Sequence, residues 1–416
     1  MSAFPIEIRD VNPEVNKKLL KDFTGERTGF LQVGPDKWFM PSKFRHEADK
    51  YYNMAIRPDD TWVVAFPRSG TTMVQEILWL LSNNLDYESA YRVPQMQRFP
   101  FLEFSTFIHE QAKVEFMSQN AMDPKKQAIL GMVALPGYEV LGYVPSPRFI
   151  KTHLPFSLLP PNLLESGAKV VYIARNPKDV AVSCYHFKRL VQAFGYTGDF
   201  ASYWDYFEKN QPRSAHSPVS VNGGDTTQPA HIPLSVNPSL YCDLNCFRIR
   251  VVVPWAPYWA HINEGWKRRH QPNVLFLFYE DINKVTYLAI RFARLTSHSL
   301  AYSSFQTFSF HPPMMLIKDL PGTVRKVAQF LNKSLSEEQV AQMSQHLNIE
   351  NFRRNPAVNM DFLKEVGLLN SGEQSFIRKG GVGGWTNEFT PELNQRADRW
   401  IHEHLKNTDI RFPSTN

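Results

Sequence analysis

The residues best suited to chemistry in this chain lie in a short polar loop at positions 66–72. An apolar, β-prone run leads into the loop, and apolar residues at i, i+3, i+4 and i+7 follow it as in a helix. The loop itself carries a cation, hydroxyl groups and one glycine: Arg68, Ser69, Gly70, Thr71 and Thr72. Free backbone N–H groups and the positive end of a helix dipole attract anions at such a point. We therefore expect this loop to bind a phosphate group.

The loop differs from two common nucleotide-binding loops. It lacks the second glycine and the Gly-Lys pair of kinase and GTPase loops. No G-x-G-x-x-G follows a strand, so the dinucleotide fingerprint is also missing. An ordinary strand-to-helix turn remains the alternative interpretation.

Three more apolar runs resemble strands, at residues 148–153, 169–174 and 273–279. They alternate with helical patterns, which is typical of a parallel sheet covered on both faces. The predicted fold class is therefore α/β, a central parallel β-sheet flanked by helices with a P-loop-like phosphate loop. Ligands in such sheets bind at the carboxyl ends of the strands. Four candidate residues occur at those ends: Arg68, His153, Arg175 and Tyr279.

A helix is predicted to begin directly after Arg175. Asn176 is a favourable N-cap residue, Pro177 suits the first helical position, and Asp179 suits the first turn.

The composition restricts the class of protein. The chain has 416 residues, 43% hydrophobic and 21% charged, with a net charge of +6. This is typical of a globular protein with an anionic small ligand, and the charge is too weak to indicate nucleic acid. No apolar run approaches a membrane span, and Glu7, Arg9 and Asp10 oppose a signal peptide. Three cysteines form neither a disulfide framework nor a metal set, so we expect a cytoplasmic protein without a metal.

Four segments together resemble the motifs of cytosolic sulfotransferases. Residues 66–72 resemble the phosphosulfate loop, 151–155 the catalytic Lys-Thr-His segment, 175–183 the 3′-phosphate signature, and 378–385 the C-terminal R-K-G-x-x-G-x-W motif. They occur in the family's order and near its spacing. The resemblance implies 3′-phosphoadenosine 5′-phosphosulfate (PAPS) as sulfonate donor.

The resemblance also implies which residues bind the donor. The 5′ side would be held by Arg68, Ser69, Gly70, Thr71 and Thr72, with Met73 next to them. The 3′-phosphate would be held by Arg175, Ser183, Arg378, Lys379 and Gly380. Tyr279 matches a tyrosine near the adenosine. Arginine suits phosphate because its guanidinium donates two parallel hydrogen bonds.

The acceptor implied by the resemblance is a small alcohol or phenol. Phenols are protonated at pH 7, so attack requires a base, and His153 is the candidate. Lys151 and Arg68 would stabilise the charge that develops on the leaving group. Four aromatic residues beside the motifs are candidates for an apolar acceptor pocket or for plain core: Phe101, Phe104, Phe156 and Phe187.

The chain departs from the family pattern at several positions. Arg68 replaces the usual lysine, Met73 replaces a tryptophan, and Leu347, Asn348 and Ile349 replace Thr-Ser-Phe. The C-terminal dimer motif is also eroded, with Thr386, Pro391 and Gln395 at its positions. The family resemblance implies a homodimer, whereas the altered dimer motif argues against one.

We expect residues 1–60 to be a lead-in that contributes to the acceptor pocket and residues 61–410 to form the sulfotransferase domain. Segments 211–250 and 285–318 interrupt the pattern. Removing 285–318 restores continuity, and its first and last codons can supply GT and AG. This predicts translated introns, with two surface loops as the alternative.

The sequence therefore predicts a sulfotransferase that moves a sulfonate group from PAPS to a phenol, a steroid or a retinoid-like alcohol. The alternative is a nucleotide-binding protein of the same fold with impaired catalysis. A P-loop kinase is disfavoured by the missing Gly-Lys pair.

Overall fold

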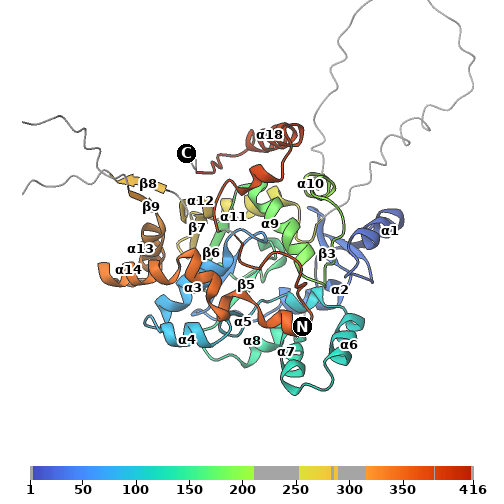
Figure 1. Cartoon of the computed structure of the whole chain (residues 1–416), viewed down its shortest axis with the longest axis horizontal. Coiled ribbons are helices and arrows are strands. Elements are labelled where there is room, and N and C mark those ends of the chain that lie inside the picture. Colours follow the sequence, from blue (N-terminus) through green and yellow to red (C-terminus); the bar gives the residue numbers. More distant parts are fainter. Residues whose placement is uncertain (1–2, 210–252, 283–284, 289–314, 379, 414–416) are drawn as a thin grey trace, which may run out of the picture.

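A computed structural model describes residues 3–209, 253–282, 285–288, 315–378 and 380–413. Its centre is a parallel sheet of β4 (Thr61–Val64), β5 (Phe149–Thr152), β6 (Lys169–Ala174) and β7 (Val274–Phe278), in the order β5-β4-β6-β7 (Figure 1). The four strands coincide with the four predicted runs. The predicted α/β fold with a central parallel sheet is confirmed.

Alternate side chains of each strand enter two separate cores, one on each face of the sheet. Val63 and Val171 pack with α3 (Thr71–Ser82), α13 (Leu320–Phe330) and α14 (Glu337–His346). On the other face, Trp62 and Val170 pack with residues of α9 (Pro177–Leu190), α10 (Phe200–Glu208) and α11 (Tyr258–Lys267). Burial on both faces explains why the strands are apolar throughout rather than alternating.

The helix after β6 begins as predicted. The side chain of Asn176 accepts a hydrogen bond from the backbone N–H of Lys178, and Pro177 is the first residue of α9. This satisfies one of the free N–H groups at the helix start. The helix places Ser183 two turns further along, on the side of the phosphate-type loop.

Residues 1–60 are more structured than a lead-in. They form an antiparallel sheet of β1 (Ile8–Asp10), β2 (Phe30–Val33) and β3 (Trp38–Pro41), together with α1 (Pro13–Asp22) and α2 (Phe44–Tyr52). The backbone of Phe39 exchanges two hydrogen bonds with the segment at Trp255 and Ala256. Most aromatic residues of this region are buried in the main core: Phe23, Phe30, Trp38, Phe39, Phe44 and Tyr51.

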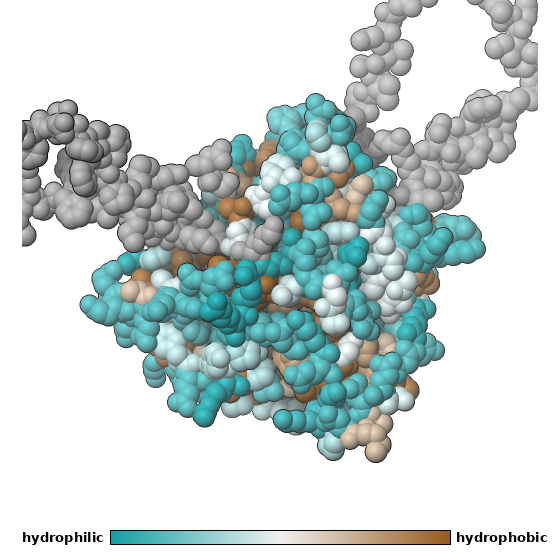
Figure 2. Space-filling view, viewed as in Figure 1, coloured by the Kyte–Doolittle hydropathy of each residue, from teal (hydrophilic) through white to brown (hydrophobic). Residues whose placement is uncertain are grey.

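The connection from α3 to β5 contains several short helices below the sheet in Figure 1. They are α4 (Tyr87–Arg92), α5 (Gln95–Arg98), η1 (Phe104–Phe107), α6 (Glu110–Gln119), α7 (Pro124–Ala134) and α8 (Gly137–Tyr143). Figure 2 shows that the face in view is mostly hydrophilic, with hydrophobic residues in small separate groups. None of the helices in the described ranges combines the length and apolar character that a membrane span requires.

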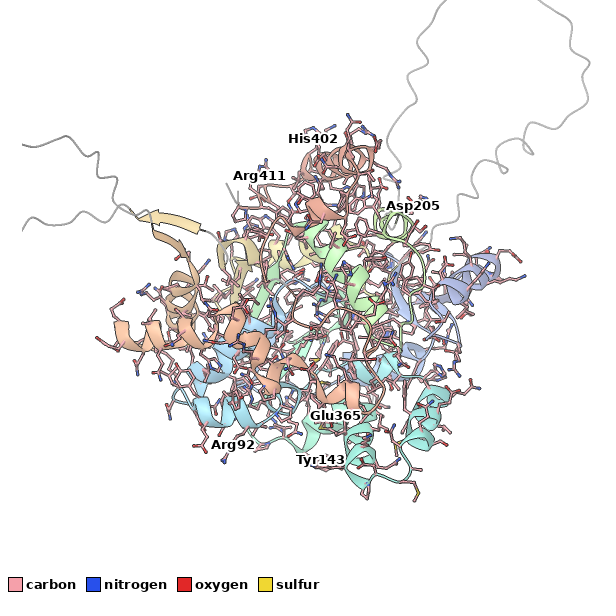
Figure 3. All side chains as sticks on the ribbon, in the orientation of Figure 1. Arg92, Tyr143, Asp205, Glu365, His402 and Arg411 are labelled. Atoms are coloured by element: carbon pink, nitrogen blue, oxygen red, sulfur yellow. The ribbon has the colours of Figure 1, made fainter. Side chains whose placement is uncertain are left out.

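The remaining elements complete the two layers. They are η2 (Phe156–Leu158), α12 (Tyr279–Ile282), α15 (Ile349–Arg354), α16 (Pro356–Asn359), α17 (Phe362–Glu365), η3 (Gly384–Asn387) and α18 (Pro391–Leu405). Figure 3 labels Asp205 on α10 and His402 on α18 at the same end of the molecule. Arg396 of α18 joins the two helices, since its Nη2 donates to Asp205 at 2.7 Å.

The two atypical segments lie mainly outside the described residues. This holds for all of 211–250. Of 285–318, the structure describes only β8 (Val285–Leu288) and β9 (Met315–Lys318), which pair antiparallel. The register places Val285 opposite Lys318, so the first and last residues of the segment are neighbours. The intron hypothesis stays a prediction.

Candidate active site

A concave site lies where the strand order of the sheet reverses. β4 connects onward to β5 on one side, while β6 connects to β7 on the other, so the loops after β4 and β6 adjoin. A cavity of about 150 Å³ opens there, at the carboxyl ends of the strands. We call it the main cavity. Its lining includes most of the predicted residues: Arg68, Gly70, Thr71, Thr72, Met73, Phe101, Lys151, His153, Arg175, Ser183, Phe187, Tyr279, Arg378 and Gly380.

The phosphate-type loop requires its glycine. Gly70 has φ of +110°, and a Cβ there would lie 2.5 Å from Cδ2 of Tyr279. Any other residue would strain the backbone and displace the tyrosine ring. Beside it, Ser69 is fully buried, and its Oγ has no hydrogen-bond partner among the described residues. A buried hydroxyl of this kind fits an anionic ligand that would accept its hydrogen bond.

Arg68 is held in a fixed orientation at the floor of the main cavity. Its Nε donates to Oγ of Ser183 at 3.1 Å, and its Nη2 donates to the backbone oxygen of Phe376 at 2.8 Å. The guanidinium also lies 5.0 Å and 4.7 Å from the ring centres of Phe187 and Phe376. Burial, with Arg175 and Arg378 nearby, lowers the pKa of Arg68 to about 10, so it stays charged at neutral pH.

Arg175 supplies a second positive group beside Arg68, since its Nη1 donates to the backbone oxygen of Arg68 at 3.2 Å. Its guanidinium carbon lies 4.2 Å from the ring centre of Tyr279, and its Nη2 donates to the backbone oxygen of Gly381 at 3.0 Å. The Nε of Arg175 is buried and has no partner within the described part of the chain. Burial also lowers the pKa of Arg378, which lines the same space. The guanidinium groups of Arg68, Arg175 and Arg378 in one cavity fit a ligand that carries anionic groups.

The C-terminal motif folds over this site. Asp179 accepts a hydrogen bond from the backbone N–H of Gly383 at 2.9 Å, which ties the segment to the start of α9. Gly380 has φ of +64°, and a Cβ there would lie 2.2 Å from Cδ1 of Ile349, so glycine is required. Lys379 lies outside the described residues. Sequence reasoning used Asp179 only as a helix-start signal and missed this second role.

The geometry of His153 leaves one ring nitrogen available as a base. Its Nδ1 lies 2.7 Å from the backbone oxygen of Ala65. A carbonyl oxygen only accepts, so Nδ1 carries the proton and Nε2 presents its lone pair. Burial, followed by the charge of Lys151, lowers the pKa of His153 well below its usual value. The imidazole is therefore neutral at pH 7.

Lys151 lies beside His153 and lines the same cavity. It is 8% exposed, and its Nζ lies 4.4 Å from the centre of the Phe101 ring. Burial lowers the pKa of Lys151 to about 8, with Arg68 adding to the effect and Glu103 opposing it. The ammonium form still predominates at pH 7.

A buried carboxylate, Glu103, supports the Lys-Thr-His segment and was missed by sequence reasoning. It accepts hydrogen bonds from Oγ1 of Thr152 at 2.8 Å, from the backbone N–H of His153 at 2.7 Å and from Nε1 of Trp255 at 3.0 Å. Burial raises the pKa of Glu103 to about 7. An acid between the aromatic residues Phe101 and Phe104 was the available signal, because a charge in an apolar run is unusual.

Trp255 is a second residue that sequence reasoning missed. It lines the main cavity and has φ of +69°, a conformation rare for a bulky residue. Its ring contacts that of His153, with 5.4 Å between centroids. The Phe101 ring contacts His153 from another side at 5.1 Å. The catalytic candidate is therefore held between two aromatic rings.

A smaller, mostly apolar cavity of about 40 Å³ adjoins the main cavity, and we call it the apolar chamber. Four residues line both spaces: Phe101, Phe187, Lys151 and Phe376. Phe104 lines the apolar chamber but not the main cavity. Phe156 lines neither. Its ring stacks on Tyr172, and the guanidinium of Arg268 lies 4.8 Å from its centre.

Among the residues the structure describes, no three His, Cys, Asp or Glu side chains are grouped so that they would hold a metal ion.

The family model described as the sulfotransferase domain matches residues 58–291 and 309–409, so the unmatched 292–308 falls within the second atypical segment. Sulfotransferase 1C2 of Oryctolagus cuniculus is 27% identical over 356 residues, covering 86% of each chain. Luciferin sulfotransferase of Photinus pyralis is 25% identical, covering 96% of this chain and 85% of that one.

A solved structure of retinol dehydratase, in complex with androsterone and the inactive cofactor PAP, superposes with a TM-score of 0.75. It is 33% identical and covers 99% of both chains. Together with the family match over most of the sequence, this establishes that the chain belongs to the sulfotransferase family.

Proposed function

We propose that this protein transfers the sulfonate group of PAPS to the hydroxyl of a small apolar acceptor, with His153 as general base. The observation that carries the proposal is the position of His153. Its free Nε2 belongs to a ring that lines the main cavity, beside Lys151 and next to the apolar chamber. The polar main cavity and the apolar chamber thus meet close to the neutral imidazole of His153.

The main cavity suits the donor. PAPS would supply an electrophilic sulfonate group on a nucleotide with separate 5′ and 3′ anionic groups. Arg68, Thr71 and the free N–H groups at the start of α3 would hold the 5′ side. Arg175, Ser183 and Arg378 would hold the 3′-phosphate. Retinol dehydratase, the solved relative at 33% identity, binds the corresponding nucleotide PAP.

His153 would move one proton. The acceptor hydroxyl would donate to Nε2 of His153, and the proton would pass to that nitrogen as the oxygen becomes nucleophilic. The hydrogen bond from Nδ1 to Ala65 would orient the ring and stabilise the imidazolium that forms. Burial and the charge of Lys151 lower the pKa of His153, so the ring is neutral and able to accept that proton.

Lys151 and Arg68 would stabilise negative charge on the leaving phosphate oxygen. Lys151 is buried and Arg68 is partly buried, so their electrostatic effect is larger than at a fully exposed surface. Among the described residues, Arg68 donates to a hydroxyl and a backbone oxygen, and the Lys151 ammonium faces an aromatic ring, so no carboxylate neutralises either charge by a direct hydrogen bond.

The acceptor would enter the apolar chamber. The chamber is lined mainly by apolar side chains, among them Phe104, Phe187 and Leu363. This favours a hydrocarbon-rich alcohol or phenol. Structures of retinol dehydratase hold androsterone or retinol beside PAP, which supports an acceptor of that kind.

The test is transfer of labelled sulfonate from PAPS to a panel of phenols, steroids and retinoids. We expect wild-type transfer, and a loss of about 100-fold or more in kcat for His153→Ala. His402→Ala is the matched control, because His402 is exposed on α18. Calorimetric binding of PAP by His153→Ala establishes that this variant is folded.

Two outcomes would contradict the proposal. PAP binding without transfer to any member of the panel would favour a nucleotide-binding protein instead. Transfer that survives in His153→Ala would exclude His153 as the base.

A further inference from the structure

A second apolar pocket lies on the far side of the apolar chamber, and we call it the side pocket. Its volume is about 160 Å³. One wall is formed by the segment 96–104, and the opposite wall by Met132 and Val133 of α7 and Val140 of α8. No lining residue is charged. The site described above does not use this pocket.

The side pocket and the apolar chamber share a wall made of side chains. Met96, Phe101 and Phe104 line both spaces. The rings of Phe101 and Phe104 are 5.6 Å apart and inclined at 46°. Met96 is only partly buried, and an unbranched methionine adapts to the shape of its neighbours. Rotations of these side chains would join the two spaces.

The opposite wall, at α8, is in contrast fixed by backbone contact. Gly137, at the start of α8, lies so close to the neighbouring segment that a Cβ would be 2.4 Å from the backbone oxygen of Leu102. Only glycine allows this approach, so α8 is pressed directly against the segment that carries Phe101. Backbone contact therefore holds the α8 wall of the side pocket in place, while the wall shared with the apolar chamber consists of side chains; Leu135, which also lines the side pocket, is exposed.

The volumes indicate that an acceptor needs both spaces. A cavity of about 150 Å³ holds a benzene ring. The apolar chamber, at about 40 Å³, is too small for that, whereas the side pocket, at about 160 Å³, is large enough. A ring that enters the apolar chamber must therefore displace side chains of the chamber wall. The side chains that the chamber shares with the side pocket can move towards that pocket.

The same wall reaches the catalytic residues. Phe101 lies against the His153 ring at 5.1 Å and under the Lys151 ammonium at 4.4 Å, while also lining the side pocket. A molecule whose hydroxyl meets His153 therefore extends past Phe101 if it is long enough.

On the basis of the function proposed above, we propose that the side pocket is a second acceptor subsite. It takes the distal, uncharged hydrocarbon part of an elongated alcohol or phenol. The protein would therefore prefer long acceptors to single-ring phenols.

The test uses 4-alkylphenols from methyl to octyl, titrated calorimetrically into protein saturated with PAP. Each buried methylene strengthens binding by about fourfold. We expect the wild-type Kd to keep falling towards octyl. Val140→Trp and Met132→Trp fill the side pocket from two different helices. In both variants, the decrease of Kd with chain length should stop at short chains. Val114→Trp, at a position 65% exposed on α6, is the matched control.

A chain-length profile that is the same in wild type and in both filled variants would overturn the proposal. So would a wild-type Kd that stops falling at the shortest members. Transfer assays with 4-methylphenol, run in parallel, separate the two proposals. If affinity increases with the length of the alkyl chain but no sulfonate is transferred, the subsite is established and the proposed reaction is contradicted.

Discussion

The Nζ of Lys151 lies 4.4 Å from the centre of the Phe101 ring, with the nearest buried carboxylate, Glu103, committed to other donors. The ammonium is thus stabilised by an aromatic face rather than by a direct ion pair. Its proton is held less tightly than that of an exposed lysine. This gives the site a titration close to physiological pH.

We predict a plateau of kcat/KM that ends near pH 8. Burial lowers the pKa of Lys151 to about 8, so its charge is present below that pH and lost above it. The lowered pKa of His153 moves the acid limb below the usual histidine range. In Lys151→Arg the basic limb should move to higher pH, because arginine stays charged. A pH–rate profile measured with a non-ionising alcohol checks this; an unmoved basic limb would assign it to another group.

Arg68→Lys, although it introduces the residue usual in the family, should weaken PAP binding about tenfold. A lysine cannot donate simultaneously to Ser183 and to Phe376, nor stack between two rings as the guanidinium does. Calorimetric titration of PAP measures the change. Arg399→Lys, at an exposed position on α18, is the control. Unchanged affinity would show that only the charge of Arg68 matters.

Glu103→Gln should lower kcat by about tenfold while leaving the Kd for PAP within twofold. The amide cannot accept all three hydrogen bonds that the carboxyl group receives, so the backbone at His153 loses its anchor. The free energy of unfolding should fall by about 1–3 kcal/mol. Denaturant unfolding and steady-state kinetics measure both effects. Glu115→Gln, on α6, is the control; a rise in KM for PAP instead would place the effect at the donor site.

Lys188→Met should stabilise the protein, most strongly at and below pH 7. The lysine is 1% exposed, its Nζ has no hydrogen-bond partner in the described ranges, and it points at the Phe194 ring from 3.3 Å. Burial lowers its pKa to about 7. The unfolded chain binds this proton up to about pH 10, so wild-type stability should rise from pH 7 to 10.

The advantage of Lys188→Met should therefore shrink over the same range. Thermal unfolding at several pH values measures this. The control is Lys125→Met, because Lys125 is exposed on α7. A stabilisation that does not depend on pH would indicate packing rather than ionisation as its cause.

The sheet was predictable because its four strands are buried on both faces and therefore read as unbroken apolar runs. Arg68, His153 and Arg175 followed from the rule that parallel strands present their carboxyl ends together. Their side chains needed no long-range information to be placed near one another. Lys151 came from the motif resemblance.

Glu103, Trp255 and Phe376 could not be placed in the same way. Each enters the site from a different connection, and only the packing of those connections brings them to His153 or Arg68. Phe156 shows the converse. It is three residues from His153 in sequence, but the chain turns into η2 and carries its ring to Tyr172 instead. The sheet in the N-terminal region could not be predicted either. Its strand β3 is hydrogen-bonded through Phe39 to Trp255 and Ala256, and such a long-range contact leaves no pattern in the sequence.

Phe376 belongs to both compartments. Its backbone and ring hold Arg68 in the main cavity, and the same ring lines the apolar chamber. We therefore expect binding of the nucleotide and binding of the acceptor to be thermodynamically linked through this residue. Whatever factor the nucleotide contributes to acceptor affinity, the acceptor returns to nucleotide affinity. Selectivity for the acceptor would then also appear as a difference in equilibrium affinity for the nucleotide.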